Sequence, residues 1–297
     1  MRKTILWMVL IALAAATARA DRPVDETRPA SADGSISIEL VAGSVTVVGT
    51  DAAELRVTGS LGDDVEELEI DEDSDGWSIE VKIPDDRDKR HHRERDIAAD
   101  LEVQVPRGSS LDVEGVSASV AVSGVSGEID AASVSGAVSV AGGSSDVEAE
   151  SVSGAVSVAS VDGSVAAESV SGRVELQNVS GEIEASTVSG NIAIAAGSVT
   201  DVEIETVAGQ VSFQGSPSGG SLDIETHSGN VEVRLPAGLG GRFELESFSG
   251  RIDNAFGPPA QRTSRYEPGT SVEFTTGSGG ADVSIETFSG NITLKSF

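Results

Sequence analysis

Cysteine is absent from this 297-residue sequence, aromatic residues number only ten, and acidic side chains far outnumber basic ones. Without cysteine, the chain cannot have a disulfide framework, a thiolate zinc site or a cysteine nucleophile. Its 20 Lys and Arg stand against 49 Asp and Glu, which gives a formal net charge of −29. Because nucleic-acid binding needs a basic surface, this charge balance excludes nucleic acid as a partner.

Long apolar runs are also missing, except within residues 1–20. There, Arg2 and Lys3 precede the apolar stretch Ile5–Ala16, and Ala18–Ala20 form a small-x-small end. This order is typical of a cleaved secretory signal peptide, and the stretch is shorter than the roughly 20 residues that span a membrane. We therefore predict export to the periplasm, the cell surface or the extracellular space, with no transmembrane segment after cleavage.

Internal repetition dominates the middle of the chain. The tripeptide Val-Ser-Gly recurs at spacings of nine or eighteen residues, and apolar residues follow the same stride. Two positions after each of these apolar residues, bulky side chains alternate with Ala, so the full period is eighteen and contains two unequal strands. The V-x-V and V-x-A patterns indicate short strands with one buried face. The repeats end at Gly127, Gly136, Gly154, Gly163 (after Val-Asp), Gly172, Gly181 and Gly190.

This periodicity predicts an all-β fold, a parallel β-solenoid with about 18–21 residues and two short strands per coil. Each coil would place Val opposite Val or Ala in the interior, and Gly at the corner can adopt positive φ without a side-chain clash. An antiparallel sandwich also uses short alternating strands. However, an array of hairpins does not require the same residue type at every ninth position, whereas stacked coils do.

Toward the C-terminus, the spacing of the corner glycines grows, and aromatic residues, absent from 78–212, return. We therefore predict wider coils filled by larger side chains. Residues 257–269 contain several Gly and Pro and predict an inserted surface loop. Asn291–Phe297 predicts the last strand of the solenoid, where Lys295 would discourage end-to-end pairing.

Four segments are predicted along the chain. They are a signal peptide over 1–20, a linker over 21–34, wide N-terminal β coils or an irregular β cap over 35–115, and the Val-Ser-Gly solenoid over 116–297. The N-terminal segment alternates apolar and polar residues without the regular repeat. A cap is expected there because an uncovered solenoid end exposes core side chains and strand edges.

Three motifs contain residues that could bind a metal or catalyse a reaction, but each is better explained by a structural role. Asp71–Gly76 begins like a calcium-binding loop, but its twelfth position is Lys82 rather than Glu, so a hairpin turn is favoured. His91 and His92 lie in a run of mixed charge that is typical of a solvated loop. His227 lies in a corner tripeptide, and the sequence contains no G-x-S-x-G motif. We predict no catalytic, cofactor-binding or metal-binding residues and no cofactor.

The two predicted strands of each coil differ in their outward side chains. One column of strands is acidic, with Asp130 and Glu148 as vertical neighbours, and the other has small residues such as Ser139 and Ser157. Val156 is predicted to be buried beside an exposed Ser157. Because small side chains lose little entropy on contact, the Ser/Ala face is the predicted contact surface. The acidic column predicts loose binding of divalent cations without a caged site.

Three stretches of the sequence resemble one bacterial family: the repeated S-V-S-G-x-V-x-V, V-A-G-S-V-T-V at 41–47, and F-S-G-N-I-T-L at 288–294. The family is an adhesin-like domain of unknown function built from β-strand repeats. The resemblance covers about 35–297. It implies a β-solenoid that is exported or displayed at the cell envelope in a non-catalytic role.

The favoured function is therefore an exported, non-catalytic β-solenoid that acts as an adhesin-like protein, an envelope scaffold or a binding protein. Its expected partner is an envelope or extracellular protein or glycan. One alternative is a β-helical carbohydrate-active enzyme, but such sites need paired catalytic groups in a cleft. The acidic residues here form a repeated row instead, so we predict no enzyme. The other alternative is an accessory protein of envelope stress.

Overall fold

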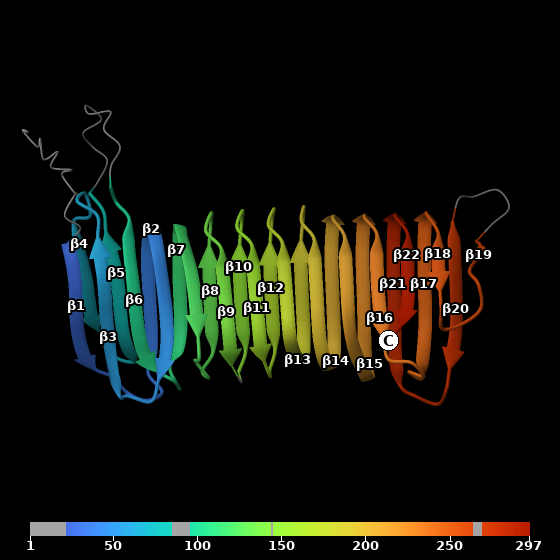
Figure 1. The fold of residues 1–297 in the computed structure, drawn as a ribbon, viewed down its shortest axis with the longest axis horizontal. Coiled ribbons are helices and arrows are strands. Elements are labelled where there is room, and N and C mark those ends of the chain that lie inside the picture. Colours follow the sequence, from blue (N-terminus) through green and yellow to red (C-terminus); the bar gives the residue numbers. More distant parts are fainter. Residues whose placement is uncertain (1–21, 85–95, 144, 264–268) are drawn as a thin grey trace, which may run out of the picture.

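The computed structural model describes residues 22–84, 96–143, 145–263 and 269–297. Within these ranges every regular element is a β-strand, and the strands stack into one elongated solenoid (Figure 1). The predicted all-β architecture is thus confirmed. No helix in this part of the chain is long and apolar enough to cross a membrane. The predicted signal peptide and the His91-His92 pair lie outside the described residues.

Short parallel strands, two per coil, form the middle of the solenoid. Paired residues of neighbouring coils lie one sequence repeat apart, as in Val147 with Val165 and Val156 with Val174. We call the column with acidic outward side chains the acidic sheet and the column with Ser and Ala the small-residue sheet. The acidic sheet contains β8 (Ile129–Ser133), β10 (Val147–Ser151) and β12 (Val165–Ser169), and the small-residue sheet contains β9 (Val138–Gly143) and β11 (Val156–Val161).

Four longer strands bend around a corner and contribute a segment to each sheet. The first, β7, pairs with β8 through one segment and with β9 through the other. In the same way, β13 pairs with β11 in the small-residue sheet and with β12 in the acidic sheet. These long strands are β7 (Ser110–Ser123), β13 (Val174–Thr187), β14 (Ile192–Ala208) and β15 (Val211–Ser228).

Alternation along each strand buries one face of both sheets. Val156 and Val158 of β11 are fully buried, and Ser157 between them is half-buried rather than exposed. In β10, Val147 and Ala149 are buried while Glu148 points outward. Full burial of a Val side chain stabilises the fold by about 1.5–3 kcal/mol, so the stacked Val and Ala columns provide the main driving force for folding.

The coils widen toward the C-terminus, as predicted. Ile192 in β14 pairs with Val211 in β15, and Val211 pairs with Val231. Register shifts near Ser198 and Val199 place the additional residues at the corner between the sheets. Phe213 occupies the interior column that holds smaller side chains in earlier coils, and it is fully buried.

At the N-terminal end the order of strands in space departs from the order in sequence. The strand β2 (Ser35–Thr50) lies between β7 on its inner side and β5 (Gly76–Lys82) and β6 (Ala99–Pro106) on its outer side. The remaining strands pair antiparallel and close this end (Figure 1). They are β1 (Arg22–Pro29), β3 (Glu54–Leu61) and β4 (Glu67–Glu72).

The C-terminal end shows the same departure. The last coil of the chain lies inside the stack: β21 pairs with both β15 and β17, and β22 pairs with both β16 and β18. The strand β20 pairs antiparallel with β17 and with β19. The bounds are β16 (Val231–Leu235), β17 (Gly241–Ser249), β18 (Ile252–Asn254), β19 (Gln261–Arg262), β20 (Thr270–Thr276), β21 (Ala281–Ser289) and β22 (Ile292–Ser296).

Four sequence-based predictions about the ends need correction. Asn291–Phe297 is not the terminal strand of the stack. Both edges of β22 are paired, one with β16 and one with β18, so Lys295 does not lie at a free end of the solenoid. The predicted linker over 21–34 contains β1, an edge strand that tolerates its prolines because their missing N–H groups are not needed for pairing on the open side. The predicted boundary at 115 falls inside β7. The predicted loop over 257–269 contains β19.

Candidate functional site: a groove along one corner

The S-V-S-G corner is fixed by a serine hydroxyl that bonds twice. Ser151 Oγ donates a hydrogen bond to the carbonyl oxygen of Gly136 in the preceding coil (3.0 Å) and accepts one from the amide of Gly154 in its own coil (2.8 Å). Ser133 and Ser169 make the equivalent bonds. A Cβ on Gly154 would lie 1.8 Å from the Gly136 oxygen, so the corner requires glycine. The motif therefore joins one coil to the next.

The valine of each S-V-S-G corner points out of the solenoid. Val134 is 47% exposed and Val188 is 51% exposed, although both are large apolar residues. Because each coil places one such residue at the same corner, the residues form a continuous line along the solenoid, which we call the apolar ridge. In spatial order the apolar ridge contains Val116, Val134, Val152, Val170, Val188, Val207, His227, Phe288 and Phe248.

The C-terminal end of the apolar ridge is aromatic. His227 stacks on Phe288 with ring centroids 4.9 Å apart, and Phe288 stacks on Phe248 at 4.8 Å. Phe288 lies between the other two rings because β21 inserts between β15 and β17. The three rings are neighbours in the order of the coils, which differs from their order along the chain.

Glutamates form a second line beside the first, on the neighbouring outward position of the acidic sheet. Glu205, Glu225, Glu286 and Glu246 are successive cross-strand neighbours. Within the part of the chain that the structure describes, Glu80 alone in this line forms an ion pair, with Lys82. This acidic ridge contains Glu80, Glu39, Glu114, Glu150, Glu168, Glu205, Glu225, Glu286 and Glu246, and is interrupted by Ala132 and Ser186.

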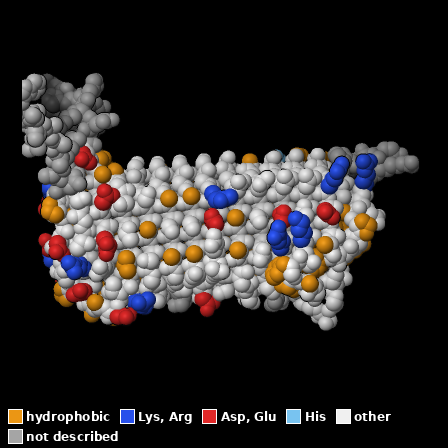
Figure 2. Space-filling view, in the orientation of Figure 1, with side chains coloured by type: hydrophobic (Ala, Val, Ile, Leu, Met, Phe, Trp, Pro, Cys, Tyr) orange, Lys and Arg blue, Asp and Glu red, His pale blue; other side chains and the backbone are white. Residues whose placement is uncertain are grey.

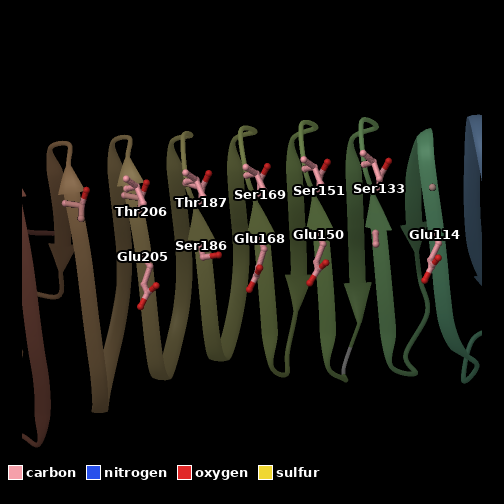
Figure 3. A pocket seen from close by; sticks show the side chains of 18 of the residues that line it. Glu114, Ser133, Glu150, Ser151, Glu168, Ser169, Ser186, Thr187, Glu205 and Thr206 are labelled. Atoms are coloured by element: carbon pink, nitrogen blue, oxygen red, sulfur yellow. The ribbon is translucent and has the colours of Figure 1, made fainter.

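A groove of about 960 Å³ runs between the two ridges. Its floor is the column of residues that precede the ridge residues in sequence: Gly115 before Val116, and Ser or Thr in the following coils, as Ser133 before Val134. Figure 3 shows this floor and the acidic ridge as two rows of side chains, with one residue of each row from each coil. The groove therefore has an apolar wall, an acidic wall and a hydroxyl-bearing floor.

The hydroxyls of the threonines in the floor are unsatisfied. Thr187, Thr206, Thr226 and Thr287 are 4–6% exposed, and their Oγ1 atoms have no hydrogen-bond partner. At Thr206, Thr226 and Thr287 the corner glycine explains this difference from the serine coils. The amide of Gly209, which would otherwise donate to Thr206, donates to the Ser228 carbonyl of the next coil (3.1 Å). The four threonines line the groove, but their Oγ1 atoms are buried beneath its surface.

Crowded carboxylates give the acidic sheet a strong negative potential. Burial, followed by the charges of Glu225 and Glu246, raises the pKa of Glu286 above its usual range. Burial, followed by the charge of Asp282, likewise raises the pKa of Asp223. Both shifts report carboxylates whose charged form lacks a compensating cation. The small-residue sheet is different: Figure 2 shows a face with few acidic side chains along its middle.

The sequence model of the Toastrack DUF4097 family matches residues 34–295. The chain belongs to the Toastrack family. Its fold is similar to a crystal structure of a "putative adhesin" from Bacteroides fragilis NCTC 9343, with 12% identity over 94% of this chain and 99% of that chain and a TM-score of 0.43. A "putative adhesin" from Parabacteroides merdae ATCC 43184 is similar at 10% identity over 94% and 100% of the two chains, with a TM-score of 0.33. A comparison with curated proteins finds no match.

Within the described ranges, the other motifs of this Toastrack chain do not come together in one site. Asp71–Gly76 joins β4 to β5 as a hairpin, in which the Asp73 amide donates to the Gly76 carbonyl (2.9 Å), so the predicted turn is confirmed. His227 belongs to the apolar ridge. Among the described residues, no three Asp, Glu or His side chains are grouped closely enough to hold a metal ion.

Sequence reasoning missed the two ridges of this Toastrack solenoid. The valine of Val-Ser-Gly marks the repeat in the sequence, and the alternation of inward and outward residues along the strand indicates that it points outward. Ile129, Ala131 and Ser133 point inward, so Val134 falls on the outward parity together with Asp130. The predicted acidic pair Asp130 and Glu148 is confirmed as cross-strand neighbours, but it lies outside the groove.

Proposed function

We propose that this chain is an exported, non-catalytic, adhesin-like binding protein of the bacterial envelope, and that it holds an elongated partner in the groove. The observation that supports this most is the length and continuity of the apolar ridge. Monomeric proteins rarely expose a contiguous apolar patch larger than a few hundred Å², and larger ones mark interaction sites. Here one half-exposed apolar or aromatic side chain follows another over most of the coils.

A role in binding rather than catalysis follows from the repetition of the groove. An enzyme concentrates different groups around one reacting bond, with an acid, a base or a nucleophile in defined positions. The groove instead repeats Glu, Ser or Thr, and Val from coil to coil. Repetition along an axis suits a partner that is itself long. The signal-like N-terminus suits an exported protein.

The proposed contact surface is the groove, whereas the sequence predicted the small-residue sheet. The sequence favoured the small-residue sheet because it is flat. Flatness alone provides little binding energy, however, and the apolar area there consists of single methyl groups. The groove offers apolar area and charge together. Binding sites for elongated or small ligands are typically concave, apolar and fitted with a few polar groups.

The test is retention of the purified protein on isolated bacterial envelopes. A groove variant, Val134→Ser with Val152→Ser and Val170→Ser, removes apolar wall without touching the core. A control variant, Ser139→Arg with Ser157→Arg, alters the small-residue sheet. We expect the groove variant to lose retention and the control to keep it, with both retaining the β-sheet circular dichroism of the parent.

Two results would contradict the proposal. Loss of retention in the control alone would move the contact surface back to the small-residue sheet. Turnover of any member of a panel of bacterial glycans by the parent protein would restore the carbohydrate-active alternative.

A further inference from the structure

We propose that the occupant of the groove is a cationic amphipathic α-helix that lies parallel to the solenoid axis. This inference rests on the proposed function, since it names the chemistry of the partner that the groove holds. The partner would place its apolar stripe on the apolar ridge and its basic side chains over the acidic ridge.

The charge of the acidic ridge indicates that the partner is cationic. Eight of the nine glutamates of the acidic ridge have no cationic partner among the described residues. Glu205, Glu225, Glu286 and Glu246 form an uninterrupted row. An anionic or neutral partner would be repelled or would leave these carboxylates uncompensated, whereas Lys and Arg side chains would pair with them.

The floor of the C-terminal half is also unusual. Buried polar groups in native proteins are nearly always hydrogen-bonded. Thr187, Thr206, Thr226 and Thr287 depart from this rule, and all four line the groove. The four threonines follow one another in successive coils of the C-terminal half.

Spacing decides between a helix and a strand. Neighbouring coils lie about 4.8 Å apart, and an extended chain repeats each face every ~6.6 Å. One turn of an α-helix advances 5.4 Å. Over four coils the mismatch is about 2 Å for a helix and about 7 Å for a strand. Long Lys and Arg side chains absorb the smaller error but not the larger one.

The geometry also excludes addition of a strand to the solenoid at this site. The groove lies on a corner, and the backbone groups beneath it already bond from coil to coil, as the Val152 amide does to the Ser133 carbonyl (3.1 Å). A partner must therefore bind through side chains. The nine positions of the apolar ridge span about 38 Å, which corresponds to an α-helix of about 25 residues.

Synthetic peptides of about 25 residues test the inference. One contains Lys and Leu arranged with helical periodicity, so that a Leu stripe lies beside a Lys stripe. A second has the same composition in strict alternation, and a third replaces Lys by Glu in the helical pattern. Fluorescence anisotropy with the purified protein measures affinity, and circular dichroism measures helix formation on binding.

We expect the helical Lys/Leu peptide to bind and gain helix, the alternating peptide to bind at least about tenfold more weakly, and the Glu peptide not to bind. Glu205→Gln with Glu225→Gln should weaken binding about tenfold. The matched control is Glu184→Gln with Glu203→Gln, which removes two exposed charges from the neighbouring acidic column, outside the groove.

Equal binding of the helical and alternating peptides would overturn the helix. If the two pairs of Glu variants weaken peptide binding equally, the peptide is attracted by the overall negative charge of the acidic sheet and not by the acidic ridge. If no peptide binds while envelope retention still depends on the groove, the proposed function stands and the partner chemistry is wrong. If retention does not depend on the groove, the proposed function itself fails.

Discussion

In the N-terminal half of the groove, at β8, β10 and β12, the floor is serine and each hydroxyl bonds to two backbone groups. In the C-terminal half, at β13, β14, β15 and β21, the floor is threonine and no hydroxyl has a partner. The walls differ as well. Valine lines the first half, whereas His227 and Phe288 join the second, where the acidic ridge also becomes continuous.

The hydroxyl at the floor position therefore has a different role in the two halves. The serine coils use the hydroxyl to hold neighbouring coils together. In the threonine coils the glycine amides of Gly209, Gly229 and Gly290 bond to carbonyls of the next coil instead, which leaves the hydroxyl unused by the fold. Both halves present the apolar and acidic ridges, and the C-terminal half adds aromatic rings and unpartnered hydroxyls to them.

The largest expected effect tests what the halves share. Gly154→Ala should lower the free energy of unfolding by about 3 kcal/mol, since its Cβ would lie 1.8 Å from the Gly136 oxygen. Gly229→Ala should cost a similar amount, because its Cβ would lie 1.7 Å from the Gly209 oxygen. Gly280→Ala, which has no neighbouring atom within 4 Å, is the control and should change stability by less than about 0.5 kcal/mol. Urea denaturation provides the measurement. Tolerance of either corner alanine would refute the close approach of the coils.

The next effect tests how the halves differ. Ser151→Ala should lower the free energy of unfolding by about 1–3 kcal/mol, because it leaves the Gly154 amide and the Gly136 carbonyl without their hydroxyl partner. Thr206→Val replaces an unsatisfied hydroxyl by a methyl group of similar size and should be neutral or stabilising. The same denaturation experiment compares them. Equal destabilisation by the two variants would erase the distinction between the halves.

A smaller effect concerns pH. Burial and then neighbouring carboxylates raise the pKa of Asp130 in one half and of Asp223 and Glu286 in the other. A raised pKa in the folded state means that protonation favours folding, so stability is lost as pH rises through these values. We predict that the melting temperature is higher near about pH 4.5 than at pH 7. Glu286→Gln should flatten this dependence.

At lower pH the trend should reverse. Hydrogen bonds from Arg234 and then Lys295 lower the pKa of Glu232, so the stability from this group is lost as pH falls through its folded-state value. A melting temperature that falls steadily from pH 7 to about pH 4.5 would show that the crowded carboxylates do not control the pH response.

The smallest effect concerns divalent cations. The acidic sheet should attract them as a diffuse field, so millimolar Ca²⁺ and Mg²⁺ should raise the melting temperature modestly and equally. Monovalent salt should reproduce part of the gain by screening. A Ca²⁺-selective transition at micromolar concentration would instead indicate a caged site and would draw attention back to Asp71–Gly76.

The middle of the solenoid was predictable because its repeat is local and strict. The V-x-V and V-x-A patterns placed Val156 in the core and Asp130 beside Glu148, and both predictions are confirmed. The ends were not predictable in this way. Ile36 of β2 pairs with Leu111 of β7, which lies far away in sequence and outside the spacing of nine or eighteen residues that organises the middle.

The groove was only partly predictable. The acidic column was visible in the sequence, and its outward direction is confirmed. The aromatic stack of His227, Phe288 and Phe248 depends on the insertion of β21 between β15 and β17, which no local pattern indicates. The free threonine hydroxyls depend on backbone bonds between coils, which are a property of stacking and not of residue type.

A titration followed by methyl NMR tests most directly whether the groove is the binding surface. Val and Ala methyl groups are labelled in the purified protein, and the helical Lys/Leu peptide is added. The account predicts shifts for ridge valines such as Val188 and Val207, with the largest in the C-terminal half, and none for Ala141 and Ala159 on the small-residue sheet. Shifts confined to those alanines, or spread evenly over both surfaces, would contradict it.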